Sequence, residues 1–179
     1  MQLHTRDLAA AVGGRLEGPD VVVDGASQDS RAITRGQLFV PVVADRDGHE
    51  FIPAALANGA SAYLTSGRLE GGTAIVVDDT IAALQAAGRH ARTLLPARVI
   101  GVTGSVGKTS VKDLLFAVLS ERWSTAASLR SFNNEIGVPL TLLGAGSSVV
   151  PRWRAAMASS ARTHSPSRVM PMASRSYRS

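Results

Sequence analysis

Cysteine is absent from this 179-residue sequence, and only two of its 19 basic residues are lysine, Lys108 and Lys112. Without cysteine the chain has no disulfide framework and no thiolate metal site. No apolar run approaches the roughly 20 residues that a membrane-spanning helix needs. Arg6 and Asp7 also interrupt the region where a secretory signal would have its apolar core. The sequence therefore predicts a soluble cytoplasmic protein that does not interact with membranes.

Acidic residues are missing from one region. All 14 Asp and Glu residues precede residue 146, whereas residues 146–179 contain six arginines and nine serines. The net charge of +5 thus belongs to this basic tail, whose composition cannot build a core. We expect the tail to be disordered and interpret it as translated out of frame. A nucleic-acid-binding arm and a membrane-surface segment are weaker alternatives, because aromatic residues are few and no apolar face is maintained.

The first half of the chain shows the alternation of strands and helices that is typical of α/β domains. Thr5 and Thr80 are the expected N-caps of its first and last helices. Apolar spacing predicts helices over residues 6–12, 53–58 and 81–95. Runs of β-branched or aromatic residues predict strands over residues 21–23, 38–40, 62–64 and 74–77. Residues 1–95 are therefore predicted to form one small α/β domain.

A second unit is predicted to start after Pro96. Residues 98–102 are expected to form a strand, and residues 108–123 a helix, with a glycine-rich turn between them. Residues 97–145 are too short to build a parallel sheet that is covered on both faces. We therefore expect this second unit to be incomplete and not to fold stably.

The turn between this strand and helix resembles a P-loop, in which glycines let backbone N–H groups surround phosphate oxygens. The chain has T-G-S-V-G-K-T in place of the general G-x-x-x-x-G-K-[ST], because Val102 stands five residues before Gly107. Lys108 is expected to contact the β- and γ-phosphates, and Thr109 to ligate Mg²⁺. The motif alone predicts a nucleotide phosphate and leaves kinases, GTPases and ligases open.

Two motifs together narrow the choice among kinases, GTPases and ligases. The P-loop and the later segment Phe132-Asn133-Asn134-Glu135-Ile136-Gly137-Val138-Pro139 resemble the Mur ligases, the ATP-dependent amide ligases of peptidoglycan synthesis. The N-terminal segments Asp29-Ser30-Arg31 and Asp47-Gly48-His49 resemble the UDP-sugar-binding domain of the same family. The resemblance covers about residues 1–145. It implies a small UDP-binding α/β domain, followed by the start of a P-loop ATPase domain.

The resemblance also implies an activity. The Asn-Asn form of the second motif is similar to the branch that joins D-alanyl-D-alanine to UDP-MurNAc-tripeptide through an acyl phosphate. ATP and Mg²⁺ are the implied cofactors, and Lys108 is the implied catalytic residue. The implied ATP-binding residues are Gly104, Ser105, Val106, Gly107, Lys108, Thr109 and Ser110, and the implied substrate-binding residues are Ser30, Arg31, His49, Asn133 and Asn134.

The chain departs from the family pattern after Ala145, where the expected Glu-Met-Gly motif does not follow. We therefore expect the chain as it stands to be an inactive, monomeric fragment that binds small molecules and no nucleic acid. The branch that adds the third peptide residue, a UDP-sugar-binding module without catalysis, and a small-molecule kinase are the alternatives. Ser30 and Arg31 fit a purely structural Asx turn as well as a UDP contact, and His49 also fits a role in ordering its own loop.

Overall fold

The computed structural model describes residues 1–43, 46–96, 98–128 and 135–145. All of these residues fall in one compact unit, Met1–Ser147. The predictions for residues 146–179 lie outside the described residues. The division near residue 96 into two functional domains stays a prediction.

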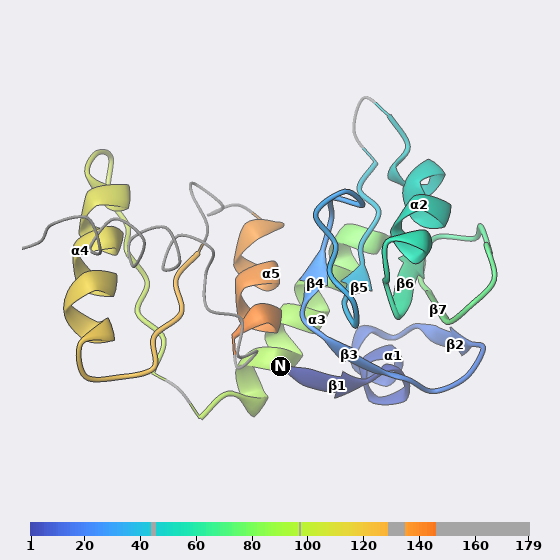
Figure 1. The fold of residues 1–179 in the computed structure, drawn as a ribbon, viewed down its shortest axis with the longest axis horizontal. Coiled ribbons are helices and arrows are strands. Elements are labelled where there is room, and N and C mark those ends of the chain that lie inside the picture. Colours follow the sequence, from blue (N-terminus) through green and yellow to red (C-terminus); the bar gives the residue numbers. More distant parts are fainter. Residues whose placement is uncertain (44–45, 97, 129–134, 146–179) are drawn as a thin grey trace, which may run out of the picture. The chain divides into compact units, whose positions relative to one another are not determined.

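This unit contains a five-stranded mixed sheet, in agreement with the predicted α/β class (Figure 1). Four neighbouring strands are parallel, and one edge strand is antiparallel to them. A separate pair, β1 (Gln2–His4) and β3 (Val22–Asp24), is antiparallel. In spatial order, the sheet consists of β2 (Arg15–Glu17), β7 (Ala74–Val76), β6 (Ala62–Thr65), β5 (Leu38–Phe39) and β4 (Ala26–Ser27).

Helices follow several of the strands in sequence. A short 3₁₀ helix, η1, leads directly into α2, and the longest helix, α3, follows the last strand of the sheet. None of the helices in the described part of the chain has the length and apolar character needed to span a bilayer. The helices are α1 (Thr5–Val12), η1 (Gly48–Phe51), α2 (Ile52–Ala57), α3 (Thr80–Leu94), α4 (Lys108–Ser120) and α5 (Gly137–Gly144).

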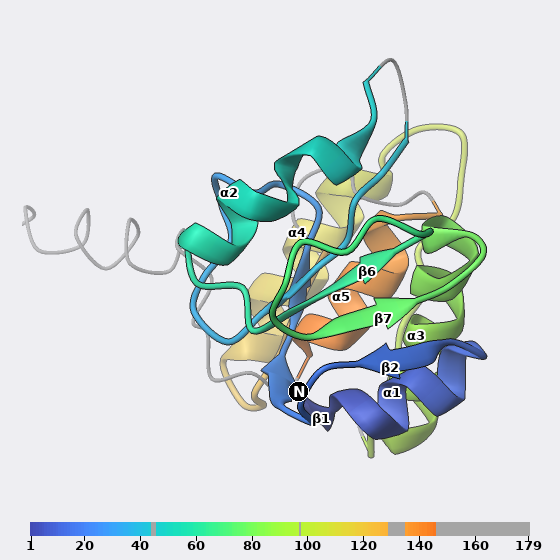
Figure 2. The same ribbon diagram turned by 90° about the vertical axis from the view of Figure 1, so that its right-hand side faces the viewer.

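The sheet has a separate apolar core on each face. Side chains alternate along a strand, so Leu64 enters one core while its neighbour Tyr63 enters the other. The larger core joins the sheet to α1, α3 and α5, and the smaller core joins it to α2 through Ile52 and Ala55. Figure 2 shows β6 and β7 between α2 and α3. The result is a three-layer α/β arrangement, with the sheet in the middle.

Two predicted helix caps are wrong for the same reason. Thr5 is the first residue of α1, and its hydroxyl donates to Asp20 Oδ1 (3.0 Å), which also accepts the Arg6 N–H (3.0 Å). Asp79 caps α3 by accepting from the N–H groups of residues 81 and 82, while the Thr80 hydroxyl donates to a buried carbonyl. In each case a carboxylate, the stronger acceptor, takes the exposed amides, and the threonine turns inward.

The predicted strand over residues 98–102 is not formed. These residues have no regular secondary structure and pair with no strand in the described part of the chain, and Val99 and Ile100 are more than half exposed. A β-strand needs a hydrogen-bonded neighbour, which local β propensity cannot supply. The helix after the glycine-rich turn forms as predicted but ends at Ser120 rather than Trp123.

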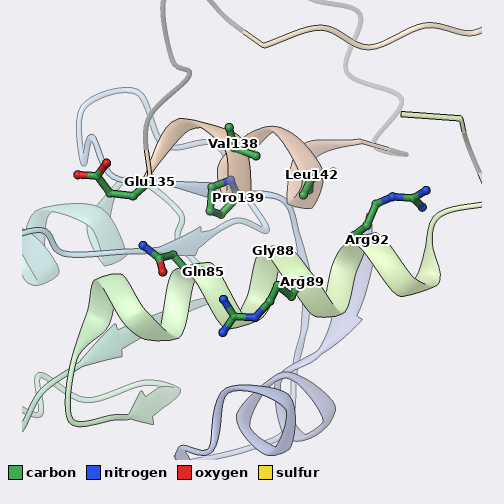
Figure 3. A pocket seen from close by; sticks show the side chains of 8 residues that line it. All are labelled: Gln85, Gly88, Arg89, Arg92, Glu135, Val138, Pro139 and Leu142. Atoms are coloured by element: carbon green, nitrogen blue, oxygen red, sulfur yellow. The ribbon is translucent and has the colours of Figure 1, made fainter. Parts of the chain in front are cut away.

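Helix α5 packs against α3 at a point where only glycine fits. A Cβ atom placed on Gly88, in the middle of α3, would lie 2.7 Å from Pro139 Cβ and 2.8 Å from its Cα. Leu143 at the end of α5 is buried in the larger core of the sheet. Figure 3 shows Pro139 of α5 facing α3 at Gly88. Helix α5 is therefore attached to the sheet layer, although it follows the glycine-rich turn in sequence.

Candidate functional site

The carboxyl ends of strands β4, β5, β6 and β7 lie along one edge of the sheet, because these strands are parallel. Ligands of open α/β sheets bind at this carboxyl edge. The residues that follow the strands there include three predicted substrate-binding residues, Ser30 and Arg31 after β4 and His49 after β5. The fold therefore brings these three to the same edge.

The predicted Asx turn is present after β4. Asp29 Oδ1 accepts the Arg31 N–H at 3.0 Å, and the Arg31 guanidinium forks onto the same carboxylate through Nε (3.0 Å) and Nη2 (3.1 Å). These bonds, led by the side-chain contact with Arg31, hold the pKa of Asp29 below its usual value. The Arg31 side chain is nevertheless 88% exposed. A guanidinium oriented by one carboxylate keeps further donors for an anionic ligand.

Ser30 is held in place by its backbone. Its carbonyl oxygen accepts from Asn58 Nδ2 at 2.9 Å, and the residue is buried. Asn58 immediately follows α2, so the first turn of the carboxyl edge is tied to the helix on the smaller core. Nothing in the local sequence connects residues 28 positions apart, and we did not predict a role for Asn58.

His49 is almost fully buried, and both of its ring nitrogens have partners. Nδ1 lies 2.6 Å from Asp47 Oδ1, and Nε2 lies 3.1 Å from the Ser66 backbone nitrogen. Asp47 also accepts the His49 N–H at 3.0 Å, as the N-cap of η1. The His49 N–H first and the ring second hold the pKa of Asp47 below its usual value. The ring therefore joins two segments of the carboxyl edge and has no free nitrogen for a ligand.

The glycine-rich turn before α4 has the backbone shape that its residues predict. Gly104 and Gly107 have φ angles of 150° and 79°, in the region that favours glycine, and Gly107 is the N-cap of α4. Gly107 has no side chain that could cap the helix, so the N-cap residue leaves the first N–H groups of α4 without a side-chain acceptor. An uncapped helix start with positive partial charge is a site for an anion such as phosphate.

Lys108 and Thr109 occupy the first turn of α4. The Lys108 ammonium folds back over the loop and donates to the carbonyl oxygens of Gly104 and, at 3.4 Å, Ser105. Thr109 is exposed at the same helix end. An ammonium held by carbonyls of its own loop would be released to an entering phosphate, which binds it with full charge.

The second lysine does not face the glycine-rich turn. Lys112 Nζ donates to the carbonyl oxygen of Ser128 at 3.0 Å and pairs with Asp113 at the same distance. It thereby ties the segment after α4 back to the helix. The sequence motif assigned Lys108 to the loop and gave Lys112 no role, and the contact of Lys112 with Ser128 could not be predicted from the sequence.

Asn133 and Asn134 lie outside the described residues. The next residue, Glu135, lies beside α3 at the rim of an open groove of about 450 Å³ between α3 and α5 (Figure 3). Arg89 and Arg92 of α3 also line this groove, whose floor includes Pro139. No cluster of His, Cys, Asp or Glu residues suited to holding a metal ion occurs in the described ranges.

A mixed sheet with four parallel strands and polar residues at their carboxyl edge, followed by a P-loop-like turn, is typical of α/β proteins with a nucleotide-type phosphate loop. A model of the Mur ligase middle domain matches residues 102–150, which include this turn. The chain is 41% identical over 138 residues to the UDP-N-acetylmuramoyl-tripeptide–D-alanyl-D-alanine ligase of Escherichia coli (strain K12), covering 76% of this chain and 30% of that protein.

Solved structures agree with this relationship. A crystal structure of MurF from Acinetobacter baumannii has a TM-score of 0.71 and 29% identity, over 80% of this chain and 33% of that chain. The MurF ligase from Thermotoga maritima in complex with ADP has a TM-score of 0.58 and 30% identity, over 69% and 29%. The chain belongs to the Mur ligase family. It spans about 30% of the length of the curated MurF ligase from Escherichia coli.

Proposed function

We propose that this chain carries the UDP-substrate and ATP-phosphate sites of an ATP-dependent ligase that joins D-alanyl-D-alanine to UDP-MurNAc-tripeptide. In this proposal residues 1–95 form the substrate domain and residues 97–145 begin the ATP domain. The observation that carries it is the uncapped start of α4, with two glycines at positive φ and Lys108 at the loop. A phosphate loop of this kind, in a chain 41% identical to a ligase of this activity, supports ATP as the phosphoryl donor.

The chemistry of the loop suits phosphoryl transfer. The γ-phosphoryl group of ATP moves to the terminal carboxylate of the tripeptide and forms an acyl phosphate, and ADP leaves. The amine of D-alanyl-D-alanine then attacks the acyl carbon, and inorganic phosphate leaves as the amide bond forms. Lys108 and the first N–H groups of α4 would stabilise the negative charge of the transferring group. Ser105, Val106 and Ser110 would complete the binding loop.

Mg²⁺ fits the same end of α4. The exposed Thr109 hydroxyl is an oxygen donor in the first turn of the helix, next to the place where the phosphates would lie. Thr109 would hold the ion, which would supply positive charge at the phosphates when bound. Phosphate oxygens and water are the other ligands that we propose for Mg²⁺ at this loop.

The carboxyl edge of the sheet is proposed as the UDP site. The exposed Arg31 guanidinium, oriented by Asp29, would bind the diphosphate, and Ser30 would contact the nucleotide beside it. Asn133 and Asn134, which lie outside the described residues, would face the substrate or the nucleotide. The proposed ligands are small molecules. We also propose that the protein is a cytoplasmic monomer without a nucleic-acid partner.

Calorimetry on the whole chain tests the proposal. MgATP and UDP-MurNAc-tripeptide should each bind, Lys108→Ala should weaken only MgATP, and Arg31→Ala should weaken only the UDP-linked ligand. Lys112→Ala is the matched control for Lys108→Ala, because Lys112 bonds to Ser128 rather than to the loop. Binding of neither ligand, or equal loss of ATP affinity in the two lysine variants, would contradict the proposal.

A further inference from the structure

The His49 ring is the point where two segments of the carboxyl edge meet. His49 is a polar residue but is only 4% exposed. Its two ring nitrogens contact residues of two different segments. Asp47 lies two positions earlier in the same turn, whereas Ser66 follows strand β6. Ser66 is exposed, so this contact lies at the surface of the proposed UDP site.

The hydrogen bonds define which ring nitrogen carries the proton. A backbone N–H can only donate, so Nε2 must accept from Ser66 and is unprotonated. Nδ1 lies 2.6 Å from a carboxylate oxygen, which can only accept when ionised, so Nδ1 carries the hydrogen. The ring is therefore neutral with its proton on Nδ1.

Other contacts fix the rest of this segment. A Cβ atom on Gly48 would lie 2.5 Å from both the nitrogen and the oxygen of Val42, so the turn packs directly on the backbone after β5. The Gly48 N–H donates to the Val42 oxygen at 3.1 Å, and the Thr80 hydroxyl holds the Pro41 oxygen at 2.7 Å. Within the described residues, the His49 ring makes the hydrogen bonds that join this segment to Ser66 at the end of β6.

The same three residues have the order of contacts of a serine-hydrolase triad. Ser66 Oγ lies 3.1 Å from Nε2, and Asp47 orients Nδ1. A general base needs the Nε2 lone pair for the serine hydroxyl, but here the N–H of the same serine also occupies it. Because the Ser66 N–H and hydroxyl share one lone pair, the contact is better suited to fixing the Ser66 backbone than to activating the Ser66 hydroxyl as a nucleophile.

We propose that His49 is a positioning residue of the UDP site: its neutral Nδ1–H form joins the turn at Asp47 to Ser66 and so sets the distance between the loops after β5 and β6. This inference rests on the proposed function of the carboxyl edge. The charged groups around the ring are Asp47 and the Arg46–Glu50 pair of its own segment, and Arg68 after β6, which pairs with Glu70. His49 therefore acts on the ligand through the loops and does not touch it.

Two measurements on the whole chain test the ring itself. Long-range ¹H–¹⁵N NMR correlations of the His49 ring should show a protonated Nδ1 and a bare Nε2. Amide exchange at Ser66 should be slow in the wild type and in His49→Gln, whose side-chain oxygen can still accept, and fast in His49→Leu. A protonated Nε2, or unchanged Ser66 exchange in His49→Leu, would overturn the inference, whether or not the chain binds a UDP-linked ligand.

Calorimetry with UDP-MurNAc-tripeptide then tests the effect on the site. His49→Leu should lower the affinity by about tenfold, the equivalent of one lost hydrogen bond, while His49→Gln should recover most of it. His90→Leu, a histidine of α3 away from the carboxyl edge, is the control and should bind as the wild type does. Fast Ser66 exchange in His49→Leu with unchanged affinity would make the ring purely structural. A wild-type chain that binds no ligand would refute the proposed function, and the positioning role with it.

Discussion

The two candidate sites of this chain use their polar groups in opposite ways. At the carboxyl edge of the sheet, Asp29, Asp47 and His49 are paired with neighbours of their own segment or of the next strand. At the start of α4 the N-cap is a glycine, and within the part of the chain that the structure describes the Lys108 ammonium bonds to carbonyls of its own loop. One site is ordered before any ligand arrives, whereas the other has donors that a phosphate would satisfy.

Apolar side chains also differ between the two regions: they are mostly buried on α3 and mostly exposed on α4. Leu84 of α3 is fully buried beneath the sheet, whereas Leu114 of α4 is 66% exposed. Both leucines lie on helices of similar length. The comparison indicates that the helices on the sheet are tightly packed, whereas α4 buries Phe116 but leaves its Leu114 face exposed.

The largest expected effect is a loss of stability on truncating a side chain in the larger core of the sheet. Leu84→Ala should lower the free energy of unfolding by about 2–5 kcal/mol, because it leaves a cavity in a packed core. Leu114→Ala should change it by less than about 0.5 kcal/mol, as an exposed position. Urea unfolding followed by circular dichroism measures both. Equal losses would show that the α4 face is buried in solution and would break the comparison.

The junction of α3 and α5 should give the next largest effect. Gly88→Ala should lower stability by about 1–3 kcal/mol through overpacking against Pro139, although alanine favours a helix by about 1 kcal/mol over glycine. Gly144→Ala is the matched control, because a Cβ there would meet nothing within 4 Å. Amide exchange should show faster opening of Gly137–Gly144 in Gly88→Ala alone. Similar stability of the two variants would mean that α5 does not dock on α3.

The cap of α3 should give a smaller effect. Asp79→Ala removes the acceptor for two N–H groups and should lower stability by about 1 kcal/mol. Asp78→Ala changes the adjacent exposed carboxylate and is expected to be close to neutral. Thermal unfolding of the two variants measures the difference. A loss at Asp78 as large as that at Asp79 would contradict the assigned cap.

The smallest effect concerns acid stability. The N–H groups of Arg6 and His49 and the Arg31 side chain lower the pKa values of Asp20, Asp47 and Asp29, respectively. A carboxyl group with a lowered native pKa stabilises the fold fully above its unfolded pKa, near 3.8, and loses this contribution as the pH falls through the native value. Asp47→Asn should therefore show a shallower loss of stability between about pH 4 and pH 2 than the wild type. Parallel curves in urea titrations would contradict this assignment.

The parts of the fold that could be predicted are those with a local signal. Gly13 ends α1 in a left-handed conformation, Pro53 stands in the first turn of α2, and the glycines before α4 have positive φ angles. Each follows from the conformational range of one residue type. The strand predicted over residues 62–64 from its run of apolar residues is likewise present, as β6.

The parts that could not be predicted depend on distant partners. The short strands β1, β2 and β4 contain two or three residues each and are defined by pairing rather than by a run. The strand expected over residues 98–102 failed for the same reason, because no partner lies beside it in the described residues. The hydrogen bond of the His49 ring depends on Ser66, 17 positions later, and no sequence spacing predicts this pair. The sequence thus indicated candidate residues, and the tertiary contacts show which of them are held by distant partners.

The most direct test of the two-site account is an amide NMR titration of the whole chain with each ligand separately. The account predicts that MgATP shifts the signals of Gly104 to Ser110, and that UDP-MurNAc-tripeptide shifts those of Asp29 to Arg31, Asp47 to His49 and Ser66. Shifts of both groups by the same ligand, or shifts of neither group by its own ligand, would contradict the assignment of two separate sites.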